Sequence, residues 1–271
     1  MGQLHPQAIF SRLVSATIVR ARDSLADALA QAGVAPNVLT LLGLLVTLAA
    51  AVLLALGAGD RPGSPTRPGY GWHGLWAAGL LILANACDML DGAVARRRRR
   101  NTQLGAFLDS CVDRLSDGLI FFGILLYYLR HPELPHARLF AALTVAALLN
   151  SELISYVKAR AENFISSCPV GYWQRGERSA AILIGLFCGH LATVMAMLAT
   201  LAGLTALRRL RFAAAQIRRL DDDRPLLDPH APLQGLLRLA PWRYPRRTLP
   251  YDLTTAANIA LILFLDLRSL P

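Results

Sequence analysis

Apolar residues form six long runs along the chain, separated by short polar segments. The runs cover residues 38–56, 74–86, 118–129, 139–153, 179–187 and 191–207. A membrane-spanning helix needs about 20 predominantly apolar residues, and several runs reach that length only if the polar residues beside them continue the same helix. The pattern predicts an all-α integral membrane protein with six transmembrane helices.

The residues before the first run have a different pattern. Apolar residues such as Phe10, Leu13 and Ile18 are interspersed with charged residues such as Arg12 and Arg20. This mixture predicts an N-terminal amphipathic helix that lies at the membrane surface. We expect a juxtamembrane segment at 1–34, a membrane domain at 35–220 and a tail at 221–271, whose apolar end either lies on the membrane surface or caps the helices.

Composition and charge support a membrane protein and give it an orientation. Hydrophobic residues make up 54% of the chain, charged residues only 17%, and the mean hydropathy is +0.40, values that argue against an ordinary soluble domain. The net charge of +10 comes from Lys and Arg that flank the apolar runs without interleaved aromatic residues, so we expect anionic lipid headgroups, not nucleic acid, as their partners. The positive-inside rule places both termini on the cytoplasmic side of an inner or plasma membrane and 59–71 in an outer loop.

An acidic stretch interrupts this apolar pattern at residues 88–113. On a helix, Asp88, Asp91, Gly92 and Ala95 share one face, and on the next helix Gly105, Asp109, Asp113 and Asp117 recur at every fourth residue. The connection at 97–102 is short, so the two helices are predicted to be antiparallel neighbours. Their carboxylates then converge near the cytoplasmic boundary.

Converging carboxylates at a membrane repel one another and need a positive partner. Two Mg²⁺ or Mn²⁺ ions bound there could clamp a pyrophosphate. Gly92, Ala95 and Gly105 would let a nucleotide approach the backbone, and Arg96 would donate to a phosphate oxygen. An aspartate pair taken alone would also fit a proton relay or an ion pair with the arginines of 96–100, of which the last four are expected to contact lipid phosphates.

The complete pattern resembles the signature of the CDP-alcohol phosphotransferases, integral membrane enzymes that make phospholipid headgroups. It reads Asp88-x2-Asp91-Gly92-x2-Ala95-Arg96-x8-Gly105-x3-Asp109-x3-Asp113 and fits at every fixed position. The resemblance implies six transmembrane helices, an N-terminal juxtamembrane helix and a homodimer. It also implies that Asp88, Asp91 and Asp109 bind divalent metal, that Asp113 helps to hold a second ion and acts as the general base, and that Gly92, Ala95 and Arg96 line the pocket for CDP.

Three cations on the same predicted side as the aspartates bear on the second substrate. Lys158, Arg178 and Arg209 suggest an acceptor that carries its own phosphate, although each could instead anchor a helix end at the membrane. The stretches "SYVKARAE", "QRGER" and "LRRL" resemble the actinobacterial group of phosphatidylinositol-phosphate synthases, in which these cations would bind inositol phosphate. Residues 174 and 176 depart from that group, which usually has Glu and Pro there.

These patterns predict an enzyme that transfers a phosphatidyl group from CDP-diacylglycerol to a phosphorylated polyol, with release of CMP. By resemblance the acceptor is inositol phosphate, and glycerol 3-phosphate is the main alternative. A hypothesis of another class is a non-catalytic transporter or scaffold that uses the aspartates as an ion site. The glycines and Arg96 of the signature argue against it, because a proton relay does not need a nucleotide pocket.

Overall fold

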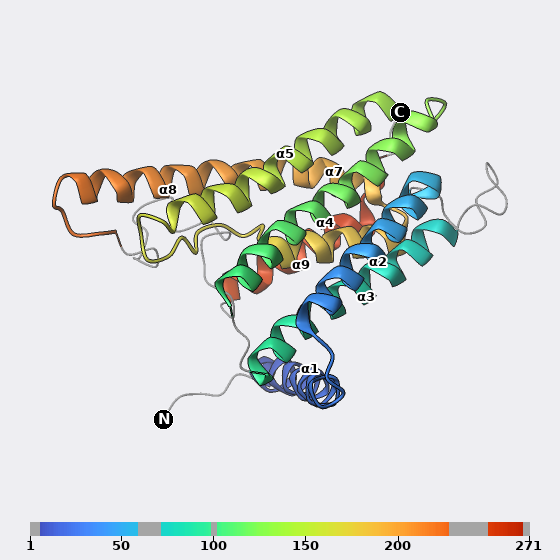
Figure 1. The fold of residues 1–271 in the computed structure, drawn as a ribbon. Coiled ribbons are helices and arrows are strands. Elements are labelled where there is room, and N and C mark those ends of the chain that lie inside the picture. The colour runs from blue at the N-terminus through green and yellow to red at the C-terminus, as the bar shows by residue number, and fades with distance from the viewer. Residues whose placement is uncertain (1–5, 59–71, 99–101, 228–248, 268–271) are drawn as a thin grey trace. The chain divides into compact units, whose positions relative to one another are not determined.

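The structure is a computed structural model that describes residues 6–58, 72–98, 102–227 and 249–267, with the backbone alone described for 6–18 and 249–250. The predicted outer loop at 59–71 therefore lies outside the described residues. Every regular element in the described ranges is helical (Figure 1). The elements are α1 (Pro6–Gln31), α2 (Pro36–Gly57), α3 (Trp72–Arg97), α4 (Gln103–Arg130), α5 (Ala137–Ala161), α6 (Arg175–Cys188), α7 (Leu191–Met197), the π-helical segment η1 (Leu198–Ala202), α8 (Gly203–Asp221) and α9 (Leu249–Phe264).

Among the described residues, four helical segments are long and apolar enough to cross a membrane: Pro36–Gly57, Trp72–Arg97, Ala137–Ala161 and Leu191–Asp221. The prediction of an all-α protein with membrane-type helices is confirmed. The count of six spans stays a prediction, because α4 carries several aspartates in its first half and α6 has only 14 residues, about 21 Å of helix.

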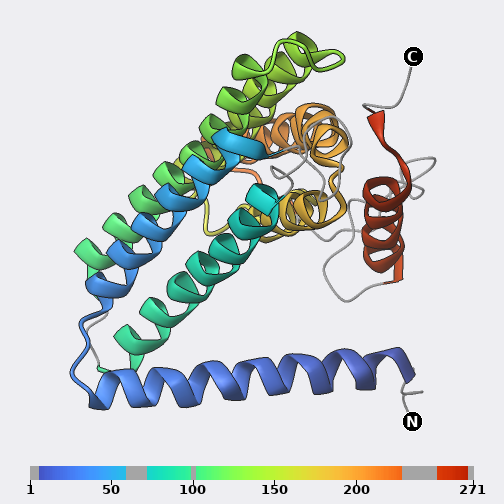
Figure 2. The same cartoon turned by 90° about the vertical axis from the view of Figure 1, so that its right-hand side faces the viewer.

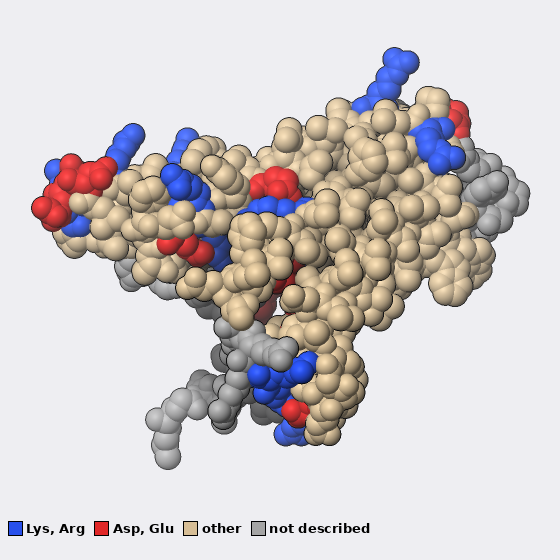
Figure 3. Space-filling view, viewed as in Figure 1, with Lys and Arg blue, Asp and Glu red and all other residues tan. Residues whose placement is uncertain are grey.

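The surface supports a membrane protein. Figure 3 shows charged side chains gathered over the C-terminal end of α8 and near the turn between α4 and α5. The surface between these two regions is mostly uncharged apart from one patch of acidic and basic residues. Many large apolar side chains are exposed on the helices, among them Leu149 at 63% and Phe122 at 54%. Exposed apolar residues in such number are costly in water and are expected where lipid contacts the helices.

Contacts divide the chain into two compact units. The first unit consists of Met1–Ala49 and Gly79–Ser116, and the second of Ala50–Ala78 and Asp117–Pro271. The first unit therefore contains the ends of α3 and α4 that carry the signature aspartates. The second unit contains α5 to α9 together with all three predicted acceptor cations.

In the first unit, α1 ends in a turn that docks against α3. Gly33 has a φ of +78°, and the amide of Val34 donates to the carbonyl of Leu29, which is the hydrogen-bond pattern of a Schellman cap. Pro36 then occupies the first position of α2, where its missing N–H costs nothing. Beside this turn a small core is built from Ala26, Leu39, Leu90, Ala93 and Val94. In Figure 2, α1 runs crosswise to α2 and α3.

Two residues of the arginine run fix this turn to α3. Arg97 forms ion pairs with Asp23 and Asp27 of α1. Arg98 donates through Nη1 to the carbonyls of Gly33 and Val34, each at 2.8 Å. Arg97 thus binds carboxylates of α1, and Arg98 binds carbonyls that the end of α1 leaves without helical partners. Contact of these two arginines with lipid phosphates stays a prediction. Arg99 and Arg100 lie outside the described residues.

In the second unit, α5 packs along η1 and α8. The side-chain amide of Asn150 donates to the carbonyls of Leu198 and Ala199, at 3.3 and 2.7 Å. A π-helical segment interrupts the regular backbone hydrogen bonds, and Asn150 satisfies carbonyls at this point.

Helices α6 and α7 form a hairpin in the second unit. The connection is closed by Gly189 in the left-handed conformation, with a φ of +71°. Gly185 faces Val194 so closely that an added methyl group would overlap with the valine side chain. The C-terminal helix α9 lies against both members of this hairpin, as the second view shows (Figure 2).

Candidate active site

The signature aspartates come from two helices joined by a short connection. Asp88 and Asp91 lie one turn apart near the C-terminal end of α3, and Asp109 lies in the second turn of α4. α3 ends at Arg97 and α4 begins at Gln103, as predicted from the sequence. One oxygen from each of these three carboxylates lies within 4.8 Å of the other two.

This carboxylate cluster, Asp88, Asp91 and Asp109, fits a divalent cation. Oxygen ligands on opposite sides of an octahedral Mg²⁺ lie about 4.2 Å apart, and the cluster brings its oxygens into that range. Hard divalent cations prefer carboxylate oxygens, and three negative groups at this separation need a positive charge between them. Asp113, one turn after Asp109 on α4, is half-buried and, among the described residues, is not in the cluster.

A threonine that the sequence reading did not single out orients the most buried carboxylate. Asp91 is only 6% exposed. The hydroxyl of Thr40, on α2, donates to Oδ2 of Asp91 at 2.6 Å. This hydrogen bond fixes the rotation of the carboxylate, as the partners of metal-ligating side chains commonly do. The stretch "APNVLTLLG" contains Thr40, but residues so far apart in the chain give no local signal that they meet.

The residues expected to line the CDP pocket lie on the same two helices. Gly92 and Ala95 are half-buried and Arg96 is exposed. A methyl group added at Gly92 would meet Nη1 of Arg96 at 3.5 Å, so the glycine leaves room beside that guanidinium group. Gly105 lies in the first turn of α4, where its amide donates to Oγ1 of Thr102 at 3.0 Å, a hydrogen bond that caps the helix.

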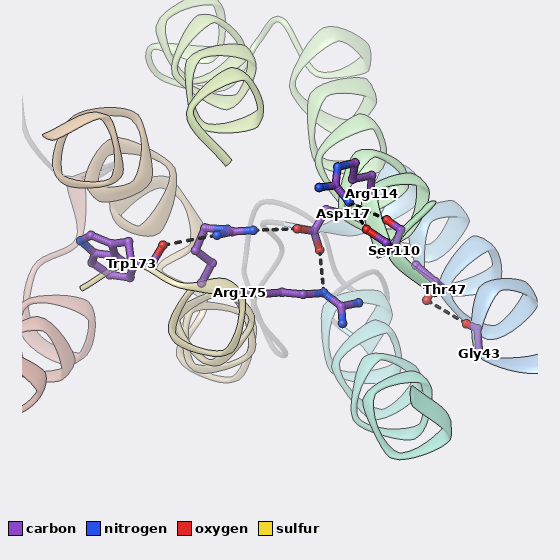
Figure 4. A network of polar contacts seen from close by, with 8 residues as sticks. Gly43, Thr47, Ser110, Arg114, Asp117, Trp173 and Arg175 are labelled. Carbon is purple, nitrogen blue, oxygen red and sulfur yellow. Dashed lines mark hydrogen bonds and ion pairs between the residues drawn. The ribbon is translucent and has the colours of Figure 1, made fainter. Parts of the chain in front are cut away.

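The second unit places Arg178 in a buried ion pair. Arg178 is 2% exposed, and its Nη2 donates to Oδ2 of Asp117 at 2.9 Å (Figure 4). Nε of Arg175 lies 3.6 Å from the other oxygen of Asp117. Asp117 was recognised in the sequence as part of the acidic stripe on α4, whereas in the structure it neutralises arginines of α6. The sequence offered no signal for this pairing.

A loop between α5 and α6 binds both buried arginines. Nη1 of Arg178 donates to the carbonyl of Trp173 at 3.3 Å (Figure 4). Arg209, 3% exposed, donates from Nε to the carbonyl of Val170 at 3.0 Å and from Nη1 to the carbonyl of Ile154 at 2.8 Å. Gly171, between the two bonded carbonyls, has a φ of +109° and lies directly against Thr205 of α8, so a larger residue would be strained there.

The third predicted cation, Lys158, is exposed near the end of α5. Lys158 lies close enough to Cys168 for the two groups to interact electrostatically. Arg209 also interacts electrostatically with Cys168. Burial raises the pKa of the Cys168 thiol, against the effect of the nearby Arg209 guanidinium. The thiol therefore stays neutral and adds no negative charge beside the two cations. Arg178 and Arg209 also interact electrostatically with each other, so the structure brings the cations together around the loop.

The chain matches a known protein family and several known proteins. A family model for CDP-alcohol phosphatidyltransferases matches residues 33–216. The chain is 43% identical over 132 residues to archaetidylinositol phosphate synthase of Methanothermobacter thermautotrophicus, which covers 48% of this chain and 62% of that protein. It is 36% identical over 170 residues to phosphatidylinositol phosphate synthase of Cutibacterium acnes, which covers 63% of this chain and 74% of the relative. The match to the archaeal relative thus spans less than two thirds of its length.

Solved structures show the same fold. The crystal structure of Mycobacterium tuberculosis phosphatidylinositol phosphate synthase with CDP-DAG bound aligns with a TM-score of 0.61 and 30% identity, over 72% of this chain and 94% of that one. The same enzyme in complex with manganese and citrate aligns with a TM-score of 0.60, over 71% and 88% of the two chains. The matched family segment contains the carboxylate cluster and all three predicted acceptor cations. The chain therefore belongs to the CDP-alcohol phosphatidyltransferase family.

Proposed function

We propose that this enzyme transfers the phosphatidyl group of CDP-diacylglycerol to inositol phosphate, giving phosphatidylinositol phosphate and CMP. A hydroxyl oxygen of the acceptor forms a bond to the lipid-side phosphorus, and the bond from that phosphorus to the CMP oxygen breaks. The carboxylate cluster is the observation that carries the proposal, because three convergent carboxylates on the family signature suit a diphosphate held through divalent metal.

We assign the metal site to Asp88, Asp91, Asp109 and Asp113, with Mg²⁺ or Mn²⁺ in two positions. When bound, the metal supplies charge neutralisation at the phosphoryl oxygens and at the departing CMP. Asp113, one turn after Asp109 on α4, helps to hold the second ion and also takes the proton of the acceptor hydroxyl. Gly92, Ala95, Arg96 and Gly105 receive the CDP group, with Arg96 donating to its phosphates.

The acceptor phosphate is assigned to Lys158, Arg178 and Arg209. A guanidinium group has more N–H donors than the carbonyl and carboxylate bonds of Arg178 and Arg209 use. Those bonds fix the two groups in place, so that binding an anion costs little side-chain entropy. Inositol phosphate is favoured over glycerol 3-phosphate because relatives from several bacteria are phosphatidylinositol phosphate synthases. Gln174, where that group usually has Glu, adjoins this region.

We further propose that six membrane spans at 35–220 hold the active site on the cytoplasmic side of the membrane. The N-terminal segment at 1–34 lies at the membrane surface, and the enzyme acts as a homodimer. Lys and Arg beside the ends of the apolar helices support this orientation, and the exposed apolar side chains support contact with the bilayer.

The proposal is tested by CMP release from CDP-diacylglycerol in detergent with Mg²⁺. Inositol phosphate, glycerol 3-phosphate, free inositol and serine are offered in separate reactions. We expect release with inositol phosphate alone. Release with glycerol 3-phosphate alone would contradict the acceptor assignment but would agree with the roles assigned to the aspartates. Absence of release with every acceptor would contradict the proposed reaction.

The base is tested by Asp113→Asn. We expect this variant to lose turnover, because an amide cannot take the acceptor proton. Binding of CDP-diacylglycerol, measured as thermal stabilisation of the protein in Mg²⁺, should largely survive. Turnover near that of the wild type would show that another group is the base.

A further inference from the structure

The C-terminal helix α9 lies beyond the segment that matches the family model, which ends at residue 216. It nevertheless lies against α6 in the second unit. At one end the Tyr251 hydroxyl donates to Oε1 of Glu177 at 2.7 Å. At the other end the carbonyl of Ile262 lies 2.6 Å from Nδ1 of His190, in the α6–α7 turn.

The same helix is anchored by burial and by a further polar contact. Ile262 is 1% exposed and Asn258 is 8% exposed. After the helix ends, the carbonyl of Leu265 accepts a hydrogen bond of 2.6 Å from Thr193 on α7. Between α6 and α9 lies a cavity of about 260 Å³, lined mainly by apolar side chains. Contacts at both ends of α9 hold it along the whole length of α6.

One contact of α9 reaches the loop that binds the buried arginines. The Tyr172 hydroxyl donates to Oγ1 of Thr255 at 3.0 Å. The Tyr172 ring packs between two other aromatic rings, with its centroid 5.3 Å from that of Tyr251 and 5.2 Å from that of Trp173. Aromatic pairs at these separations contribute beyond their buried area. The loop is therefore held by α9 from one side and by the arginines from the other.

A continuous series of contacts thus connects α9 with a predicted acceptor cation. Thr255 holds Tyr172, and the next residue, Trp173, offers its carbonyl to Arg178. Arg178 in turn pairs with Asp117. Glu177, the partner of Tyr251, directly precedes Arg178 in the first turn of α6. Both tyrosine hydrogen bonds act on the backbone segments that set the position of this guanidinium group.

We propose that α9 positions the acceptor site, with Thr255 and Tyr251 as positioning residues that hold Arg178 through the loop and the first turn of α6. This inference rests on the proposed function, since it takes Arg178 as a ligand of the acceptor phosphate. Neither residue touches a reacting atom. Loss of either contact should weaken binding of the phosphorylated acceptor and leave the use of CDP-diacylglycerol unchanged.

The test compares two substitutions at one position of the full-length protein. Thr255→Val keeps the shape of the side chain and removes the oxygen that accepts from Tyr172, whereas Thr255→Ser keeps that oxygen. We expect Thr255→Val to raise the KM for inositol phosphate by about threefold to tenfold, the change that one lost hydrogen bond corresponds to. The KM for CDP-diacylglycerol and kcat should stay within about twofold. Thr255→Ser should behave as the wild type.

A second pair of variants and a second measurement complete the test. Tyr251→Phe should show the same rise in the acceptor KM, and Tyr156→Phe, at a tyrosine 61% exposed on α5, should show none. Hydrogen exchange of the amides at 168–174 should be faster in Thr255→Val than in Thr255→Ser, because the loop has lost one of its anchors.

Two outcomes would overturn the inference while the proposed function stands. The first is a wild-type acceptor KM in both Thr255→Val and Tyr251→Phe. The second is a parallel loss in the KM values of both substrates and in kcat, which would make α9 a purely structural element. Absence of CMP release from the wild type with every acceptor would refute the proposed function, and the inference with it, before any variant is compared.

Discussion

The carboxylate cluster in the first unit and the arginine site in the second unit, Arg178 and Arg209, differ in how their charges are balanced. The cluster gathers Asp88, Asp91 and Asp109, which are charges of one sign. In the second unit the protein itself supplies the oxygens that meet the charges of Arg178 and Arg209. A site of the first kind depends on an external cation, and a site of the second kind is part of the folded structure.

This difference predicts that substitutions in the cluster change activity far more than stability, whereas substitutions in the arginine site change both. Like charges at short range destabilise the folded protein until a cation binds. A buried arginine that loses its partner leaves an uncompensated charge in the interior.

The largest effect is expected for Asp91→Asn. The substitution removes a negative oxygen from the cluster, and CMP release should fall by about a thousandfold or more because charge stabilisation of the transition state is lost. Thermal stability without metal should be equal to that of the wild type or higher. Asp222→Asn, at an exposed residue following α8, is the matched control. Comparable activity of Asp91→Asn and the control would contradict the metal assignment.

Asp117→Asn is expected to have the second largest effect, and it should change both activity and stability. Arg178 loses its ionic partner while it stays buried, which should lower the free energy of unfolding by about 3 kcal/mol. The acceptor KM should rise by about tenfold, because the guanidinium group is no longer held in place. Thermal unfolding in detergent and initial rates measure the two effects. A variant with the melting temperature of the wild type would show that the pair does not stabilise the second unit.

Lys158→Ala and Arg209→Ala distinguish a cation that only binds the acceptor from one that also stabilises the fold. Lys158 is exposed, so its loss should raise the acceptor KM by about tenfold without a change in melting temperature. Arg209 donates to two loop and helix carbonyls, so its loss should raise the KM and also lower the free energy of unfolding by about 2 kcal/mol. Equal effects on the KM for CDP-diacylglycerol and on that for the acceptor would refute the phosphate assignment for either residue.

The smallest effect is expected for Thr40→Val, which removes the hydrogen bond to Asp91. The Mg²⁺ concentration for half-maximal activity should rise by about tenfold, as for other partners of metal ligands, and activity in saturating Mg²⁺ should recover. Thr47→Val on the same helix is the control, because the Thr47 hydroxyl donates only to the carbonyl of Gly43 among the bonds described. If both variants require the same Mg²⁺ concentration, Thr40 does not orient the ligand.

The convergence of Asp88, Asp91 and Asp109 could be predicted from the sequence because it depends on local geometry. Helical spacing places Asp88 and Asp91 on one face of α3, and Asp109 and Asp113 on one face of α4. The short connection makes the two helices neighbours. The residue types in the signature then indicate the chemistry. The all-α membrane architecture was predictable for a similar reason, since hydropathy along the chain is a local property.

The partners of the charged residues could not be predicted, because they depend on contacts between distant parts of the chain. Thr40 and Asp91 are 51 residues apart, and Asp117 and Arg178 are 61 apart. Arg97 and Arg98 were expected at lipid phosphates, and no local signal indicated their contacts with α1 and the turn that follows it. For the tail the sequence left two alternatives, the membrane surface or a cap on the helices, and gave no signal for the contacts of α9 with α6 and α7.

The central claim, a metal-dependent transfer from CDP-diacylglycerol to inositol phosphate, is tested most directly by removing and restoring the metal. Purified protein is stripped with a chelator, and CMP release with inositol phosphate is followed while Mn²⁺ or Mg²⁺ is titrated back. The account predicts no release in the stripped protein and full recovery with either ion, but no recovery in the variant Asp88→Asn/Asp91→Asn/Asp109→Asn. Steady CMP release in the presence of excess chelator would contradict it.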